Sequence, residues 1–176
     1  METGEITDKS VRSFGDVPRG VIFSPSTMSP VEPDGTLGPE RTLAVVFAEG
    51  YVTFLDVAHP ERREVTVRLA LPGMSDSIVP ERMVFAPSAG TAYLRVSGSS
   101  DVYVFLLTSR ETADPSENDF VVSINTLAAG AVPADVALFR DGGRPQVLVA
   151  NRQSQDLAVI DAQTAEFFTI PVGYPV

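Results

Sequence analysis

Few residues of this chain combine the types and spacing that enzyme chemistry requires. His59 is the single histidine, and a histidine beside a serine and an aspartate would be the general base of a hydrolase. No Gly-x-Ser-x-Gly segment is present to supply the nucleophile. His59 lies in the polar stretch 58–63, which is typical of a turn between two strands. We therefore predict no catalytic residue.

A calcium site is the second chemical possibility. Residues 114–119 read Asp-Pro-Ser-Glu-Asn-Asp, which places oxygen ligands at alternate positions, as in calcium loops. Asp119 stands where such loops have a glycine, and Asn125 stands where they have a bidentate glutamate. We therefore predict an acidic loop with no metal ion and no cofactor.

Composition excludes further classes of function. The formal net charge of −10 disfavours nucleic acid and anionic membrane surfaces, which carry the same sign. The chain has no cysteine, so disulfides and thiolate chemistry are excluded. Phosphate-binding Gly-rich loops and the His-Glu-x-x-His motif are missing. No apolar run is long enough for a membrane-spanning helix.

The elements that would position any site come from an internal repeat. A Val-Pro start followed by alternating apolar residues recurs at Pro18, Pro80 and Pro133, and Gly-Tyr-Pro175 begins a fourth copy. The starts are 62, 53 and 42 residues apart. The shortest step matches the ~40–45 residues of a four-stranded propeller blade. We therefore predict an all-β fold: a β-propeller segment of about three four-stranded blades.

Each unit contains four runs with β-branched or aliphatic residues at period two, separated by turn residues. The expected strands are 20–23, 42–48, 51–57 and 64–71; then 82–85, 91–96, 101–107 and 120–127; then 135–139, 146–150, 156–161 and 166–170.

The longer units carry insertions, which set the predicted boundaries. Both insertions leave the same side of a propeller, and we expect solvated, mobile loops there. The predicted parts are 1–16, the outer strand of a preceding blade; 17–78, the first blade, with a Pro-rich insertion at 24–41; 79–131, the second blade, with an acidic insertion at 108–119; 132–173, the third blade; and 174–176, the start of another.

The third unit resembles a known repeat. Residues 132–139 (VPADVALF), 147–151 (VLVAN), 157–161 (LAVID) and 169–175 (TIPVGYP) look like the YVTN-type propeller repeat of surface-layer-like and lactonase-like proteins. The first two units match more loosely, with Glu49 and the stretch 97–100 in place of the asparagine. The resemblance implies adhesion, ligand display or a scaffold around an enzyme, and the fold alone does not choose among these.

Two groups of residues are candidates for particular roles. Asn151 follows a strand, and Asp56 and Asp161 lie near the ends of strands; their side chains can hydrogen-bond to the backbone of the next turn. Propellers usually bind at the mouth formed by the turns into the first strands and by the second-to-third-strand hairpins. The ligand-face candidates there are Arg19, Glu49, Glu81, Arg82, Ser97, Asp135, Asn151 and Arg152.

We thus expect a non-catalytic interaction or scaffold module of a larger extracytoplasmic protein, in the periplasm or on the surface of a bacterium. The expected partner is a protein or surface ligand, together with the remaining propeller blades or a second copy of this chain. Two alternatives stay open: a fragment of a lactonase-like propeller enzyme and a calcium-stabilised adhesive domain.

Overall fold

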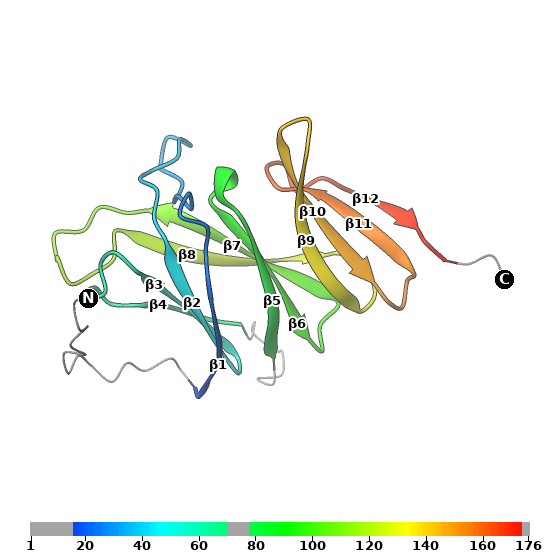
Figure 1. The fold of residues 1–176 in the computed structure, drawn as a ribbon, viewed down its shortest axis with the longest axis horizontal. Helices are drawn as coiled ribbons and strands as arrows, with labels where there is room; N and C mark the ends of the chain where they lie inside the picture. Colours follow the sequence, from blue (N-terminus) through cyan, green and yellow to red (C-terminus); the bar gives the residue numbers. More distant parts are fainter. Residues whose placement is uncertain (1–15, 70–77, 174–176) are drawn as a thin grey trace, which may run out of the picture.

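Three four-stranded antiparallel sheets stand side by side in chain order (Figure 1). The structure is a computed structural model that describes residues 16–69 and 78–173. The strands are β1 (Pro18–Phe23), β2 (Leu43–Ala48), β3 (Tyr51–Asp56) and β4 (Val65–Arg68); β5 (Val79–Ala86), β6 (Thr91–Ser97), β7 (Asp101–Ser109) and β8 (Phe120–Ala128); and β9 (Pro133–Asp141), β10 (Arg144–Asn151), β11 (Asp156–Asp161) and β12 (Phe167–Pro171). Each sheet is an up-and-down meander of consecutive strands, as in a propeller blade.

The prediction of an all-β fold built from blade-like four-stranded sheets is confirmed. Each expected strand within the described residues is present, and β5 and β9 begin earlier than expected, at Val79 and Pro133. The one helical element in the described part of the chain is the short 3₁₀ turn η1 (Pro87–Ala89). The predicted outer strand in 1–16 and the fourth start in 174–176 lie almost wholly outside the described residues.

The middle sheet is apolar on both faces because it is packed between the other two. On one side, Phe54 of β3 meets Phe105 of β7, with ring centroids 5.6 Å apart, in a cluster joining the first and second sheets. On the other side, Val102 belongs to a cluster with Val147 and Ile160 of the third sheet. Burial of each such side chain contributes about 2 kcal/mol.

The same irregularity occurs near the start of each sheet. The register of the first strand shifts after its starting proline, at Arg19 in β1, at Glu81 in β5 and at Ala134 in β9. A β-bulge of this kind re-aims the side chains around it. The three units therefore share the same irregularity at their starts.

The two insertions pack against each other in part, and the rest of each is exposed to solvent. Val31 of the first insertion bridges Thr108, and its N–H donates to the carbonyl oxygen of Leu107 at 2.8 Å. Met28 is fully buried, and Asn118 of the second insertion is 2% exposed. Residues 33–37 and 113–115 of the insertions are exposed, as expected of solvated loops. Met28, Val31 and Asn118 depart from that expectation, because they take part in tertiary contacts.

Candidate functional site

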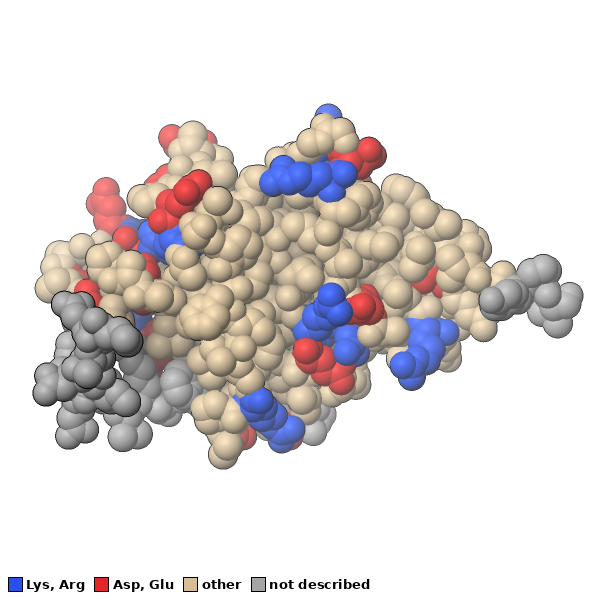
Figure 2. Space-filling model, in the orientation of Figure 1, with Lys and Arg blue, Asp and Glu red and all other residues tan. Residues whose placement is uncertain are grey.

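The starts of β1, β5 and β9 and the β2–β3, β6–β7 and β10–β11 hairpins lie along one margin of the molecule, the lower one in Figure 1. We call it the mouth margin. Figure 2 shows basic and acidic side chains at this margin and also at the opposite, upper one, with a largely uncharged surface between the two. The predicted ligand-face residues belong to these turns and hairpins.

A groove of about 420 Å³ opens at this margin between the second and third sheets. One wall is the β6–β7 hairpin, residues 96–100, and the other is the segment 132–134 that leads into β9. Glu81, Arg95 and Arg152 complete the lining. The structure thus brings three of the predicted ligand-face residues together here: Glu81, Ser97 and Arg152.

Arg95 is a lining residue that the sequence reasoning missed. Its side chain is 21% exposed and pairs with the carboxylate of Glu81, and Nη1 lies 3.5 Å from the carbonyl oxygen of Pro133. Its Nε–H is buried and has no hydrogen-bond acceptor. A guanidinium normally uses its N–H donors when buried, so this donor is left unsatisfied beneath the groove. Arg95 shares its face of β6 with Thr91, Tyr93 and Ser97, so the alternation of the strand gave no signal of its burial.

The groove is locally basic although the chain is strongly acidic. Its lining contains two arginines and one glutamate, against a net charge of −10 for the whole chain. Arg152 follows β10 and is exposed, and its guanidinium forms no ion pair with another described residue. The arrangement favours a single anionic group, such as a carboxylate.

Val132 gives the groove a strained wall. Its φ is 57°, in the left-handed region that β-branched residues avoid. The next residue is Pro133, and a residue before proline normally adopts extended backbone. The carbonyl oxygen of Val132 accepts a hydrogen bond from the N–H of Arg152 at 3.0 Å. Strain of this kind costs about 1–3 kcal/mol and is concentrated at functional sites.

Two further ion pairs lie outside the groove lining. Arg19 at the β1 bulge pairs with Glu49 of the β2–β3 hairpin, within the first sheet. Arg82 of β5 pairs with Asp135 of β9 at 3.1 Å, which connects the second and third sheets. Pairs as exposed as these contribute at most about 1 kcal/mol.

The three predicted turn residues have different surroundings. Asp56 accepts a hydrogen bond from the N–H of Ala58 at 2.9 Å, and Asp161 accepts one from that of Gln163 at 2.8 Å. Asn151 is 4% exposed, and its Nδ2 donates to the carbonyl oxygen of Ala129 and to Asp156. Asn151 therefore lies beneath the mouth margin.

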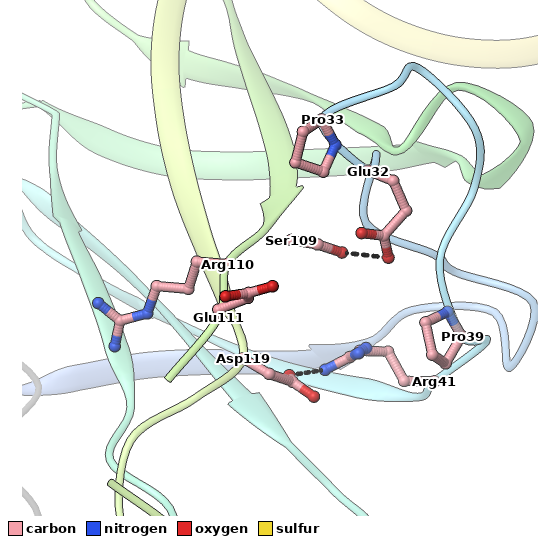
Figure 3. A pocket seen from close by; sticks show the side chains of 8 residues that line it. All are labelled: Glu32, Pro33, Pro39, Arg41, Ser109, Arg110, Glu111 and Asp119. Atoms are coloured by element: carbon pink, nitrogen blue, oxygen red, sulfur yellow. Dashed lines mark hydrogen bonds and ion pairs between the residues drawn. The ribbon is translucent and has the colours of Figure 1, made fainter. Parts of the chain in front are cut away.

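A second hollow, of about 280 Å³, lies between the two insertions (Figure 3). Figure 3 shows Ser109 donating to Glu32 and Arg41 paired with Asp119. Arg41 is 7% exposed, also contacts Asp56 at 3.2 Å, and lies over the ring of Phe120. Both Arg41 and Asp119 are thus engaged in holding the insertions together.

The pKa of Asp119 reflects this network. Partial burial acts to raise the pKa, but the hydrogen bonds and positive charges of Arg41 and Arg62 outweigh it, so the pKa lies below its ordinary value. The carboxylate therefore remains ionised and paired at neutral pH.

His59 is exposed in the β3–β4 turn, with Nδ1 at 3.3 Å from Oε1 of Glu61.

In the acidic insertion, Oδ1 of Asp114 accepts hydrogen bonds from the N–H and hydroxyl of Ser116. Within residues 16–69 and 78–173, no three histidine or carboxylate side chains form a group that could hold a metal ion. The described part of the chain also has no helix with the length and apolarity to cross a membrane.

No protein-family model matches the chain, and no curated protein or solved structure is similar to it at a significant level.

Proposed function

We propose that this chain is a non-catalytic β-propeller segment of the YVTN type, which acts as an interaction or scaffold module of a larger extracytoplasmic bacterial protein. The observation that carries the binding role is the basic groove between the second and third sheets, with Arg95 and Arg152 in its lining. The repeat motif in residues 132–175 is the basis for the YVTN affiliation and for the location in the periplasm or at the cell surface.

The chemistry of the groove suggests what part of a partner it recognises. The buried Nε–H of Arg95 requires an acceptor, and Arg152 adds an exposed positive charge. Ser97 and Ser100 belong to the wall formed by the β6–β7 hairpin. A carboxylate on an otherwise uncharged or basic partner segment satisfies these donors, because a second negative charge would be repelled by the acidic chain.

A nuclear magnetic resonance titration tests this proposal. The probe is a capped Gly/Ser peptide with one aspartate, and the same peptide with asparagine is the control ligand. We expect the aspartate peptide to shift the amide signals of residues 97–100 and the Nε–H signal of Arg95. Arg152→Ala should weaken these shifts, whereas Arg140→Ala, which removes an exposed arginine near the β9–β10 turn, should leave them intact.

Equal shifts with both peptides, or equal losses in both variants, would show that the groove does not recognise a carboxylate. In that case the anion-binding proposal fails.

A further inference from the structure

The third sheet has an open face on the side away from the second sheet, where exposed aromatic and aliphatic side chains lie beside the carboxylates of Asp141, Asp161 and Glu166. A groove of about 1000 Å³ runs over it. Phe139 is 41% exposed, Phe168 59% and Ile170 43%, and Val159 lies between them. We call this the tail face. Exposed apolar surface of this extent normally marks an interaction site.

The strand registers identify what this face is built to contact. The second and third sheets can be aligned at their starting prolines, Pro80 and Pro133, and then from strand to strand through the paired residues. In this alignment Phe139 of the third sheet corresponds to Ala86 of the second, and Ile170 corresponds to Leu127. Ala86 is fully buried, and both Ala86 and Leu127 pack in the cluster beneath the third sheet. The equivalent face of the second sheet is thus covered by another blade-like sheet.

The first sheet presents the complementary face at the other end of the row (Figure 1). Val21 and Phe23 occupy the positions of Met83 and Phe85, which pack against the first sheet inside the molecule. In the first sheet these positions are exposed, Val21 by 57% and Phe23 by 63%. We call this the head face.

We propose that the tail face of one chain packs against the head face of a second copy of this chain. The two internal contacts, first sheet to second and second to third, have this same head-to-tail geometry. Two such contacts between two chains form a closed ring of six sheets, within the range of about four to eight blades found in propellers. A head-to-tail contact that closes on itself produces a symmetric dimer.

Sedimentation velocity on three variants tests the proposal. Phe168→Glu alters the tail face, Phe23→Glu alters the head face, and Leu37→Glu is the matched control in the first insertion, where Leu37 is 46% exposed. The wild-type chain and Leu37→Glu should be dimers at micromolar concentration. Each face variant alone should be monomeric, with a dissociation constant raised at least roughly thirtyfold, as for interface hot spots.

Mixing the two face variants gives the sharper result. The intact tail of Phe23→Glu can still pack on the intact head of Phe168→Glu, so an equimolar mixture should form a heterodimer with one contact. Circular dichroism should show unchanged melting of each monomer, because both residues are exposed within it. A monomeric wild-type chain, a dimer that either face variant leaves intact, or a mixture without heterodimer would overturn the proposal.

Discussion

Asp56 and Asp161 occupy equivalent positions at the ends of β3 and β11, and each carboxylate accepts a hydrogen bond from the N–H two residues later, at 2.9 and 2.8 Å. They differ in what else they contact. The other oxygen of Asp56 faces the buried guanidinium of Arg41 at 3.2 Å, whereas Asp161 lies on the open tail face beside Gln146. One turn residue has thus acquired a second role in the buried network.

Replacement of each aspartate by asparagine separates the two roles. Asparagine keeps an acceptor for the turn but removes the charge. We expect Asp56→Asn to lower the free energy of unfolding by about 2 kcal/mol, the value of a hydrogen bond to a charged group, because Arg41 remains buried. Asp161→Asn is the matched control and should change stability little. Urea denaturation measures both, and equal effects would contradict the distinction.

The network around Asp119 predicts a dependence on pH. Because the folded-state pKa of Asp119 is lowered from 3.8, its contribution to stability is complete above that value and is lost as the pH falls through the folded-state pKa. The difference in unfolding free energy between wild type and Asp119→Asn should therefore be largest near neutral pH and narrow in acid. Glu40→Gln, in the first insertion, is the control. A difference that stays constant down to acid unfolding would refute this assignment.

The strain at Val132 predicts a stabilising substitution. Val132→Gly should raise the free energy of unfolding by about 1 kcal/mol, because glycine adopts positive φ without the Cβ penalty, and Val132 is 47% exposed and loses little packing. Val79→Gly is the matched control, since Val79 also precedes a proline but does not have positive φ. The Val79→Gly variant should be less stable than the wild type. Thermal melts of both variants test the prediction, and a lowered melting temperature for Val132→Gly would contradict it.

Close packing beneath the mouth margin predicts the reverse effect at Gly130. A Cβ on this residue would lie 2.3 Å from Nδ2 of Asn151, and its φ is 132°. Gly130→Ala should lower the free energy of unfolding by about 2 kcal/mol. Gly98→Ala, at φ 77° with no atom near the added Cβ, isolates the backbone cost of about 1 kcal/mol. Similar losses of unfolding free energy in the two variants would show that the side chain of Asn151 moves away from the added methyl group at little cost.

Calcium should not stabilise the chain. In the acidic insertion, Oδ1 of Asp114 accepts hydrogen bonds from Ser116, and both carboxylate oxygens of Asp119 are paired, with Arg41 and Arg62. A calcium ion would have to displace these arginines. We expect the melting temperature to be the same in millimolar calcium and in chelator. A rise of several degrees that Asp114→Ala abolishes would restore the calcium-stabilised adhesive alternative.

Much of the candidate site could be anticipated from the repeat. Aligning Pro18, Pro80 and Pro133 places Glu81 and the hairpin residues Ser97 and Arg152 at one margin, because equivalent turns of consecutive meanders emerge on the same side. Arg95 could not be assigned in this way. Its position within an apolar strand is visible, but its burial depends on the neighbouring sheet.

The sequence by itself determined the strands and their meander order, because period-two patterning and tight turns act between residues close in the chain. Only the tertiary structure decided that the insertions dock on each other, that Arg41 is buried between carboxylates, and that Val132 has positive φ. These features arise from contacts between segments such as Val31 with Thr108 and Arg41 with Asp119. The local sequence pattern cannot specify such contacts. A strand packed between two sheets is apolar on both faces, so its pattern does not show which neighbouring segment covers each face.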